Sequence, residues 1–173
     1  MLLLGSGGAR ARDLAGLALR SLALGNVENM VSVTQLLIDL LSAEEEATQS
    51  RAADGLWDLV NENPSAHLEI AEAGDARKLV ALLTEGLPRA KDYAIWSLSL
   101  SISPTTQSDV LEAGGVDPLI HVLQDPRLAI QEEAAMALAK LADDNDEAQA
   151  AISASGGVKP LLNMISPSAS AAT

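Results

Sequence analysis

Hydrophobic and small residues recur along this chain in one pattern, at steps of 37, 42 and 40 residues. The pattern is Ala-x-x-small-Leu-x-x-(Leu or small), and spacings of three and four residues place its members on one face of a helix. A second marker, two adjacent apolar residues, returns at steps of 40 and 42 residues. Because both markers keep the same register, they predict a tandem array of helical repeats. The pattern begins at Ala15, Ala52, Ala94 and Ala134, and the apolar pairs are Leu79-Val80, Leu119-Ile120 and Leu161-Leu162.

The best-preserved repeat predicts three helices. Asp125 is a candidate N-cap and Pro126 suits a first helical position, so we expect a long helix from about 126 to 141. Turn-forming residues end this helix, and a short helix follows over about 147–154. Gly156-Gly157 closes the short helix, because glycine accepts the left-handed conformation at a helix end. The middle helix of the next repeat then begins at Val158.

Upstream copies follow the same order of short, middle and long helices. We expect middle helices at 76–83 and 116–123, with a long helix beginning near Pro88. In the earliest complete copy we expect a short helix at 27–31 and a middle helix at 33–41, although no glycine separates them. A long helix at 9–24 would belong to the copy before it. The predicted organisation is one solenoid over 1–166, made of a partial repeat 1–26, repeats at about 27–74, 75–115 and 116–157, and a partial repeat 158–166, followed by a flexible Ser/Ala-rich tail 167–173.

The repeats resemble those of the armadillo family. The resemblance is most specific from Glu112 to Leu141, where Ala-Gly-Gly-x-x-Pro-Leu-Ile is followed by the long-helix pattern. It implies an all-α, right-handed superhelical α-solenoid of three-helix units, with about three full repeats and partial repeats at both ends. It also implies that the long helices line a concave groove that binds extended peptides or other proteins. A HEAT array, with two helices per unit, is the alternative, but the Gly-Gly break and the third helix favour armadillo repeats.

Composition supports a helical chain that binds neither nucleic acid nor membranes. Hydrophobic residues make up 48% of the chain but aromatic residues only 2%, so Ala, Leu, Ile and Val must build the core. The net charge of −13 disfavours nucleic acid and anionic lipid and favours basic partners. We find no signal peptide and no apolar stretch near the roughly 18 residues of a spanning helix, and therefore expect a cytoplasmic protein. The absence of cysteine excludes disulfides and thiolate metal sites.

The long helices carry the candidate binding residues. In armadillo proteins that bind extended peptides, of the importin-α and β-catenin types, these helices carry a Trp and, four residues later, an Asn that holds the ligand backbone. Only Trp96 matches the first row and no Asn stands in the second, which argues against recognition of nuclear-localisation signals. The first row here is Leu17, Asp54, Trp96 and Met136, and the second is Ser21, Asp58, Leu100 and Lys140.

Acidic residues are expected around an apolar patch on this surface. Asp13, Asp92 and Glu132 stand one helical turn before the first row. Acids around bulky apolar side chains suit a partner segment that carries Lys or Arg together with hydrophobic residues. The alternative is that these acids only solvate a helix face. The predicted partner-binding groove consists of Asp54, Asp58, Asp92, Trp96, Leu100, Glu132, Met136 and Lys140.

Other chemical features have structural explanations. The loop Gly5–Gly8 lacks the Gly-Lys-Ser/Thr ending of a phosphate loop, so we expect a linker. Glu44–Glu46 complements the dipole at a helix start rather than forming a metal site. His67 and His121 lie in different repeats, and we assign neither to catalysis nor to metal binding. Trp57 is either an interface anchor or a cover for a neighbouring helix.

These observations predict a non-enzymatic protein–protein interaction scaffold, without cofactor or metal. Its groove would bind a partner protein or an extended basic and apolar segment. The alternative function is a structural subunit or fragment of a larger assembly, docked through the solenoid ends. This alternative rests on the two ends of the array, where we recognise none of the polar caps that close repeat arrays. We therefore expect either further repeats or a partner that covers the ends. An enzyme is poorly supported, because no nucleophile–base pair and no metal-ligand spacing occurs.

Overall fold

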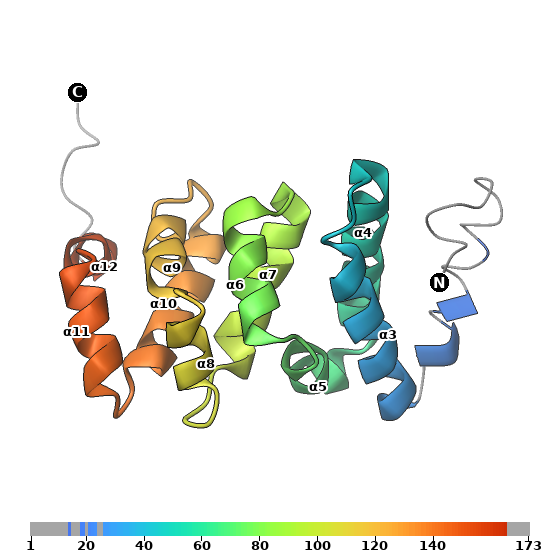
Figure 1. The fold of residues 1–173 in the computed structure, drawn as a ribbon, viewed down its shortest axis with the longest axis horizontal. Coiled ribbons are helices and arrows are strands. Elements are labelled where there is room, and N and C mark those ends of the chain that lie inside the picture. Colours follow the sequence, from blue (N-terminus) through green and yellow to red (C-terminus); the bar gives the residue numbers. More distant parts are fainter. Residues whose placement is uncertain (1–13, 15–17, 20, 24–25, 166–173) are drawn as a thin grey trace.

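Helices stand side by side along one axis in the computed structural model, which describes residues 14, 18–19, 21–23 and 26–165. Helices α3 and α12 lie towards opposite ends of this row (Figure 1). No strand occurs among the described residues. The elements are α3 (Val27–Leu40), α4 (Glu46–Glu62), the 3-10 turn Pro64–Ala66, α5 (His67–Glu72), α6 (Ala76–Glu85), α7 (Pro88–Ser101), α8 (Gln107–Glu112), α9 (Val116–Val122), α10 (Leu128–Ala142), α11 (Asp146–Ala154) and α12 (Val158–Ile165).

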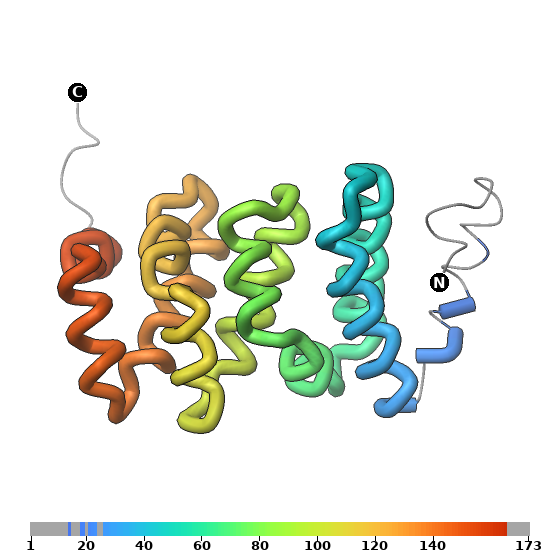
Figure 2. The backbone as a smooth tube through the Cα atoms, in the orientation of Figure 1, coloured from blue at the N-terminus to red at the C-terminus, as the bar shows by residue number. Residues whose placement is uncertain are grey.

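The long helices form the spine of the stack. Helix α4 contacts α7, and α7 contacts α10, while each also packs on the helix before it, α4 on α3, α7 on α6 and α10 on α9. Figure 2 shows the backbone stepping from one such group to the next. One hydrophobic cluster runs through the groups, from Ala23 to Ile152. The all-helical solenoid predicted from the repeats is therefore confirmed.

The Gly-Gly pairs end the short helices α8 and α11, and the two glycines of a pair have different tasks. Gly114 and Gly156 have φ angles of 73° and 77°, in the left-handed region that favours glycine. A Cβ on Gly115 would lie 2.7 Å from a methyl group of Val110, and one on Gly157 would lie 2.8 Å from a methyl group of Ile152. The first glycine thus supplies the backbone conformation, and the second supplies space.

The predicted break within residues 27–41 is wrong. One uninterrupted helix, α3, spans Val27–Leu40, and the Asn26 side chain caps it by accepting a hydrogen bond from the Asn29 N–H at 2.9 Å. Neither Gly nor Pro interrupts these residues. The buried side chains recur at helical spacing across the expected break, so continuing the helix leaves the apolar face intact. They are Met30, Val33, Thr34, Leu37 and Ile38.

The start of the last long helix is also corrected. Helix α10 begins at Leu128, not at 126, and Asp125 does not cap it. Asp125 Oδ1 instead accepts hydrogen bonds from the backbone N–H and the Nε–H of Arg127, both at 2.9 Å, which holds residues 125–127 in a turn. The predicted starts at Pro88 and Val158 are confirmed.

Several predictions concern residues that lie wholly or partly outside the described part of the chain. Residues 14, 18–19 and 21–23 of the predicted helix 9–24 are helical. The rest of that helix, the linker at Gly5–Gly8, Asp13, Leu17 and the tail 167–173 lie outside the described residues. The repeat boundaries near 74, 115 and 157 stay a prediction.

Small residues stand where long helices approach other elements. Ala137 is fully buried on α10, and Ser97 is fully buried on α7, where its Oγ donates to the Ala71 carbonyl at 2.9 Å. A Cβ on Gly55 of α4 would lie 3.4 Å from Leu37 of α3. A larger side chain at such a position has to displace a neighbour, since core packing leaves little free volume.

Replacing Ala137 with Leu should therefore destabilise the fold by about 1–3 kcal/mol through overpacking. The matched control is Ala81→Leu, on an exposed position of α6, which should change stability far less. Urea unfolding followed by circular dichroism measures both. Equal stability of the two variants would contradict the packing described for α10.

Candidate partner-binding face

Three long helices carry the predicted groove residues, and the middle one, α7, contacts both others. Within each helix these residues are four apart, so they share one face. We call this set the long-helix face: Asp54 and Asp58 on α4, Asp92, Trp96 and Leu100 on α7, and Glu132, Met136 and Lys140 on α10.

Trp96 is held in an aromatic cluster at the junction of α4 and α7. Its ring centroid lies 5.7 Å from that of Tyr93, 6.1 Å from that of Trp57 and 5.5 Å from that of His67, which meets it edge-on. Trp57, Tyr93 and Trp96 are the only Trp, Tyr or Phe residues in the sequence. Trp96 itself remains half-buried, so one part of the ring is fixed while another reaches the surface.

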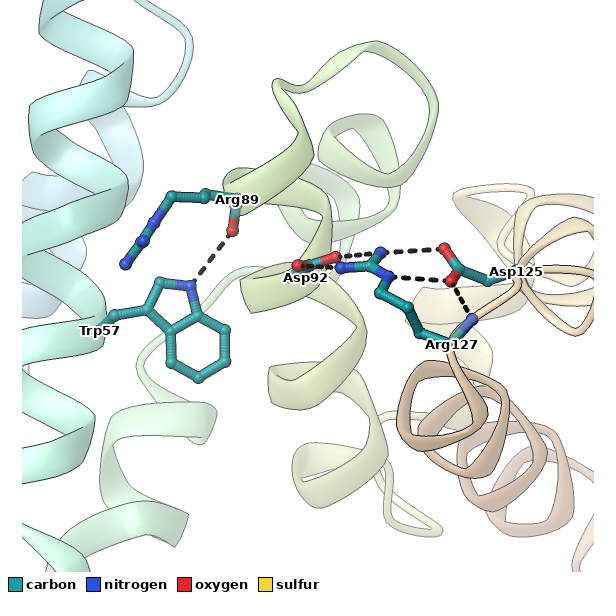
Figure 3. Close-up of polar contacts among 5 residues, drawn as sticks. All are labelled: Trp57, Arg89, Asp92, Asp125 and Arg127. Atoms are coloured by element: carbon teal, nitrogen blue, oxygen red, sulfur yellow. Dashed lines mark hydrogen bonds and ion pairs between the residues drawn. The ribbon is translucent and has the colours of Figure 1, made fainter.

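Trp57 covers the neighbouring helix, which was one of the two alternatives. It is half-buried, its ring lies 6.2 Å from that of Tyr93, and its Nε1–H donates to the Arg89 carbonyl of α7 at 3.3 Å (Figure 3). Burial raises the pKa of the Tyr93 hydroxyl, which therefore stays neutral in this cluster. His67 also belongs to the cluster, a contact that no sequence pattern indicates. Its Nε2 donates to the Val60 carbonyl at 2.9 Å, because a carbonyl oxygen only accepts.

The apolar part of the face continues from α7 to α10. Leu100 is half-buried, and Met136 is 45% exposed. Lys140 Nζ donates to the Leu100 carbonyl at 2.9 Å, near the end of α7. Its contact links the two helices and satisfies a carbonyl of the last turn.

Two of the predicted acidic residues are paired with arginines. Arg89 Nε lies 2.9 Å from Asp54 Oδ1. The Arg127 guanidinium donates to both oxygens of Asp92, at 2.6 and 2.8 Å (Figure 3). Asp54 and Asp92 are therefore not open carboxylates, contrary to the expected acidic rim. Asp58 and Glu132 are exposed.

Both ion pairs follow one rule of the repeat. Each joins an aspartate of one long helix to an arginine 35 residues later, within a Pro-Arg dipeptide before or at the start of the next long helix. Arg127 also donates to Asp125, which lowers the pKa of that carboxyl, and the two carboxylates together raise the pKa of the guanidinium. The recurring Pro-Arg dipeptide is the sequence signal that would have revealed these pairs.

A buried amide network fixes the end of α10. Gln107 of α8 is buried, and its Nε2 donates to the carbonyls of Lys140 and Asp143, each at 2.8 Å. Asn145 Nδ2 in turn donates to Gln107 Oε1 at 3.1 Å. Sequence reasoning missed this network, because a glutamine in a short helix gives no pattern that indicates burial.

The surface next to the Asp92–Arg127 pair is hollowed. A cavity of about 460 Å³ opens there between the turns that precede α7 and α10, with Pro88, Lys91, Ile95 and His121 among its lining residues. Across the described part of the chain, no group of three or more His, Cys, Asp or Glu residues is arranged to hold a metal ion. No helix in that part is long and apolar enough to cross a membrane.

Asp125→Asn should lower the free energy of unfolding at neutral pH by about 0.2–1 kcal/mol, the range for ion pairs near the surface. The pKa of Asp125 in the fold lies below its ordinary value of 3.8, so its contribution is present above that pH and disappears as the pH falls through the folded pKa. Urea titrations at neutral and strongly acidic pH should show the difference from wild type shrinking in acid. Glu85→Gln, at the exposed end of α6, is the control. A difference that stays constant with pH would contradict the role of this pair.

Comparisons with known proteins agree with the repeat geometry. Residues 106–143 match the Armadillo/beta-catenin-like repeat. The chain is 26% identical over 133 residues to importin subunit alpha-1b of Oryza sativa subsp. japonica, which covers 75% of the chain and only 25% of that importin's length. An engineered protein solved by the Northeast Structural Genomics Consortium is 28% identical, with a TM-score of 0.67 over 97% of this chain and 71% of that one. A designed armadillo repeat protein in complex with the peptide (KR)4 is 23% identical, with a TM-score of 0.68 over 96% of this chain and 73% of that one, and shares the fold. These matches support an armadillo-repeat architecture for the chain.

Proposed function

We propose that this chain is a non-enzymatic interaction scaffold whose long-helix face binds an extended segment of a partner protein. The observation that carries the proposal is the apolar strip formed by Trp96, Leu100 and Met136 across two neighbouring long helices. Importin subunit alpha-1b and the designed protein bound to (KR)4 support it, since both share the repeat architecture. The chain's cytoplasmic location remains a prediction.

Trp96 is suited to anchor such a segment. Aromatic residues fixed before binding lose little rotamer entropy in the complex, which makes them frequent centres of binding energy. The cluster of Trp57, Tyr93 and His67 restrains the Trp96 ring in this way. Met136 lies one repeat further, and its flexible side chain adapts to different apolar partners.

The charge of this chain indicates which charged residues a partner segment should carry. The net charge of −13 favours a cationic segment, but Asp54 and Asp92 are already matched by arginines. Exposed Glu132 lies one helical turn before Met136 of the apolar strip, so we propose a partner with apolar residues at the strip and Lys or Arg beside them. The missing asparagine row means that the face recognises side chains more than peptide backbone.

The alternative function, a subunit docked through its ends, is supported by a separate surface. Val158, Leu162 and Ile165 of α12 are 50%, 58% and 79% exposed. The two functions use different residues, and substitutions in one surface should leave the other unaffected.

A fluorescent peptide of alternating Lys and Leu should bind the long-helix face, and a Glu-Leu peptide should not. Met136→Ala should weaken binding about fivefold to tenfold, roughly the 1–1.4 kcal/mol of one lost apolar contact. Trp96→Ala should weaken it further, and Glu132→Gln should reduce its dependence on salt. Fluorescence anisotropy measures these affinities.

Leu68→Ala is the matched control, because Leu68 is an exposed leucine on the short helix α5. Circular dichroism establishes that Trp96→Ala remains folded. Wild-type affinity in both Met136→Ala and Trp96→Ala, or equal binding of the Glu-Leu peptide, would refute the proposal.

A further inference from the structure

An apolar surface lies at the α12 end of the row. A cavity of about 260 Å³ opens there between α10, α11 and α12, and Ala135, Leu138, Ala139, Ala142, Ile152 and Leu161 line most of it. We call this cavity, with the exposed side chains Val158, Leu162 and Ile165, the C-terminal end face. No helix covers this face within the described residues.

The interior of the stack shows what covers the same surface elsewhere. Val116, Ile120 and Leu123 stand one repeat before Val158, Leu162 and Ile165, and all three are buried. The residues one repeat before Ala135, Ala139 and Ala142 are buried as well, and they are Ile95, Ser99 and Ile102. The next long helix, α10, contacts α7, α8 and α9 there. A helix with the pattern of a long helix, followed by further helices, is therefore the natural occupant.

The other end of the chain exposes a stripe that fits this requirement. Leu14 and Leu22 are each 57% exposed, and Ala18 between them is exposed too. These residues are four apart, and all three are helical, so they lie along one side of a helix. We call them the N-terminal stripe.

The repeat register equates this stripe with Glu133, Ala137 and Leu141 of α10. Glu133 accepts a hydrogen bond from Ser99 of α7, and Ala137 and Leu141 are completely buried. In α10, these positions form the side that packs on the preceding repeat. The three residues of the N-terminal stripe hold the same positions in the repeat register, but they are exposed.

Charge is complementary between the two ends. The first 26 residues contain three arginines, Arg10, Arg12 and Arg20, and one aspartate, in a chain with a net charge of −13. Exposed Glu132, Asp143 and Asp144 lie on or just after α10. Glu132 stands one repeat after Asp92, which pairs with an arginine of the next repeat. An arginine of an incoming helix would repeat that pairing.

We propose that the N-terminal stripe of one copy packs on the C-terminal end face of a second copy. The contact joins two different surfaces, so it has no twofold symmetry and adds copies head to tail. The following helix α3 of the incoming copy would cover α12, as α11 contacts α9 in the interior. This association shares Glu132 with the long-helix face but uses none of its apolar residues Trp96, Leu100 and Met136.

Sedimentation velocity over a wide concentration range tests the proposal. The wild-type mass should rise continuously with concentration and fall in high salt. Leu22→Glu blocks the stripe and Leu162→Glu blocks the end face, and each should weaken association at least tenfold. Both leucines are more than half exposed, so both variants should keep the wild-type circular dichroism spectrum and melting temperature. Leu68→Glu, an exposed leucine away from both ends, should associate as wild type.

A mixture of the two blocked variants gives the sharpest result. Leu22→Glu retains a working end face, and Leu162→Glu retains a working stripe, so the mixture should form a 1:1 dimer and nothing larger. A wild-type protein that stays monomeric at every concentration would overturn the proposal and leave the face to a helix of another protein. A mixture without dimer, or blocked variants that associate as wild type, would overturn it equally.

Discussion

The structure depends on contacts between consecutive long helices. A unit of about forty residues cannot bury enough apolar surface to offset its loss of conformational entropy, so each repeat is stabilised by its neighbours. Small residues on these helices leave room for close packing, since Ser97 and Ala137 are both fully buried. Among the described long helices α4, α7 and α10, only α7 packs against a long helix on both sides.

The same stacking creates the surface that we propose for partner binding. Because α4, α7 and α10 pack one after another, residues about forty positions apart, such as Trp96 and Met136, stand on neighbouring long helices. The Asp–Arg pairs link consecutive repeats. They also offset the negative charge of Asp54 and Asp92, which the sequence alone assigns to the groove. Residues of the stack therefore also form the proposed apolar strip, in which Trp96 and Leu100 are half-buried and Met136 is exposed.

Periodicity predicted most of the fold, because apolar spacing and glycine pairs act locally. Gly114 and Gly156 end short helices as their sequence context indicates, and Trp96 lies on the predicted face. Asp125 was misassigned because its partner, Arg127, lies two residues away in a turn that competes with the cap. The pairing of Asp92 with Arg127 and the burial of Gln107 depend on how neighbouring repeats meet, which no local pattern reports.

Native-state hydrogen exchange, followed by mass spectrometry on dilute protein, tests most directly whether neighbours stabilise each repeat. Protection should be greatest in α7, which has long helices on both sides, and should decline towards α12, whose outer side chains are exposed. Uniform protection from α3 to α12, or the strongest protection in α12, would contradict a stack stabilised by its neighbours.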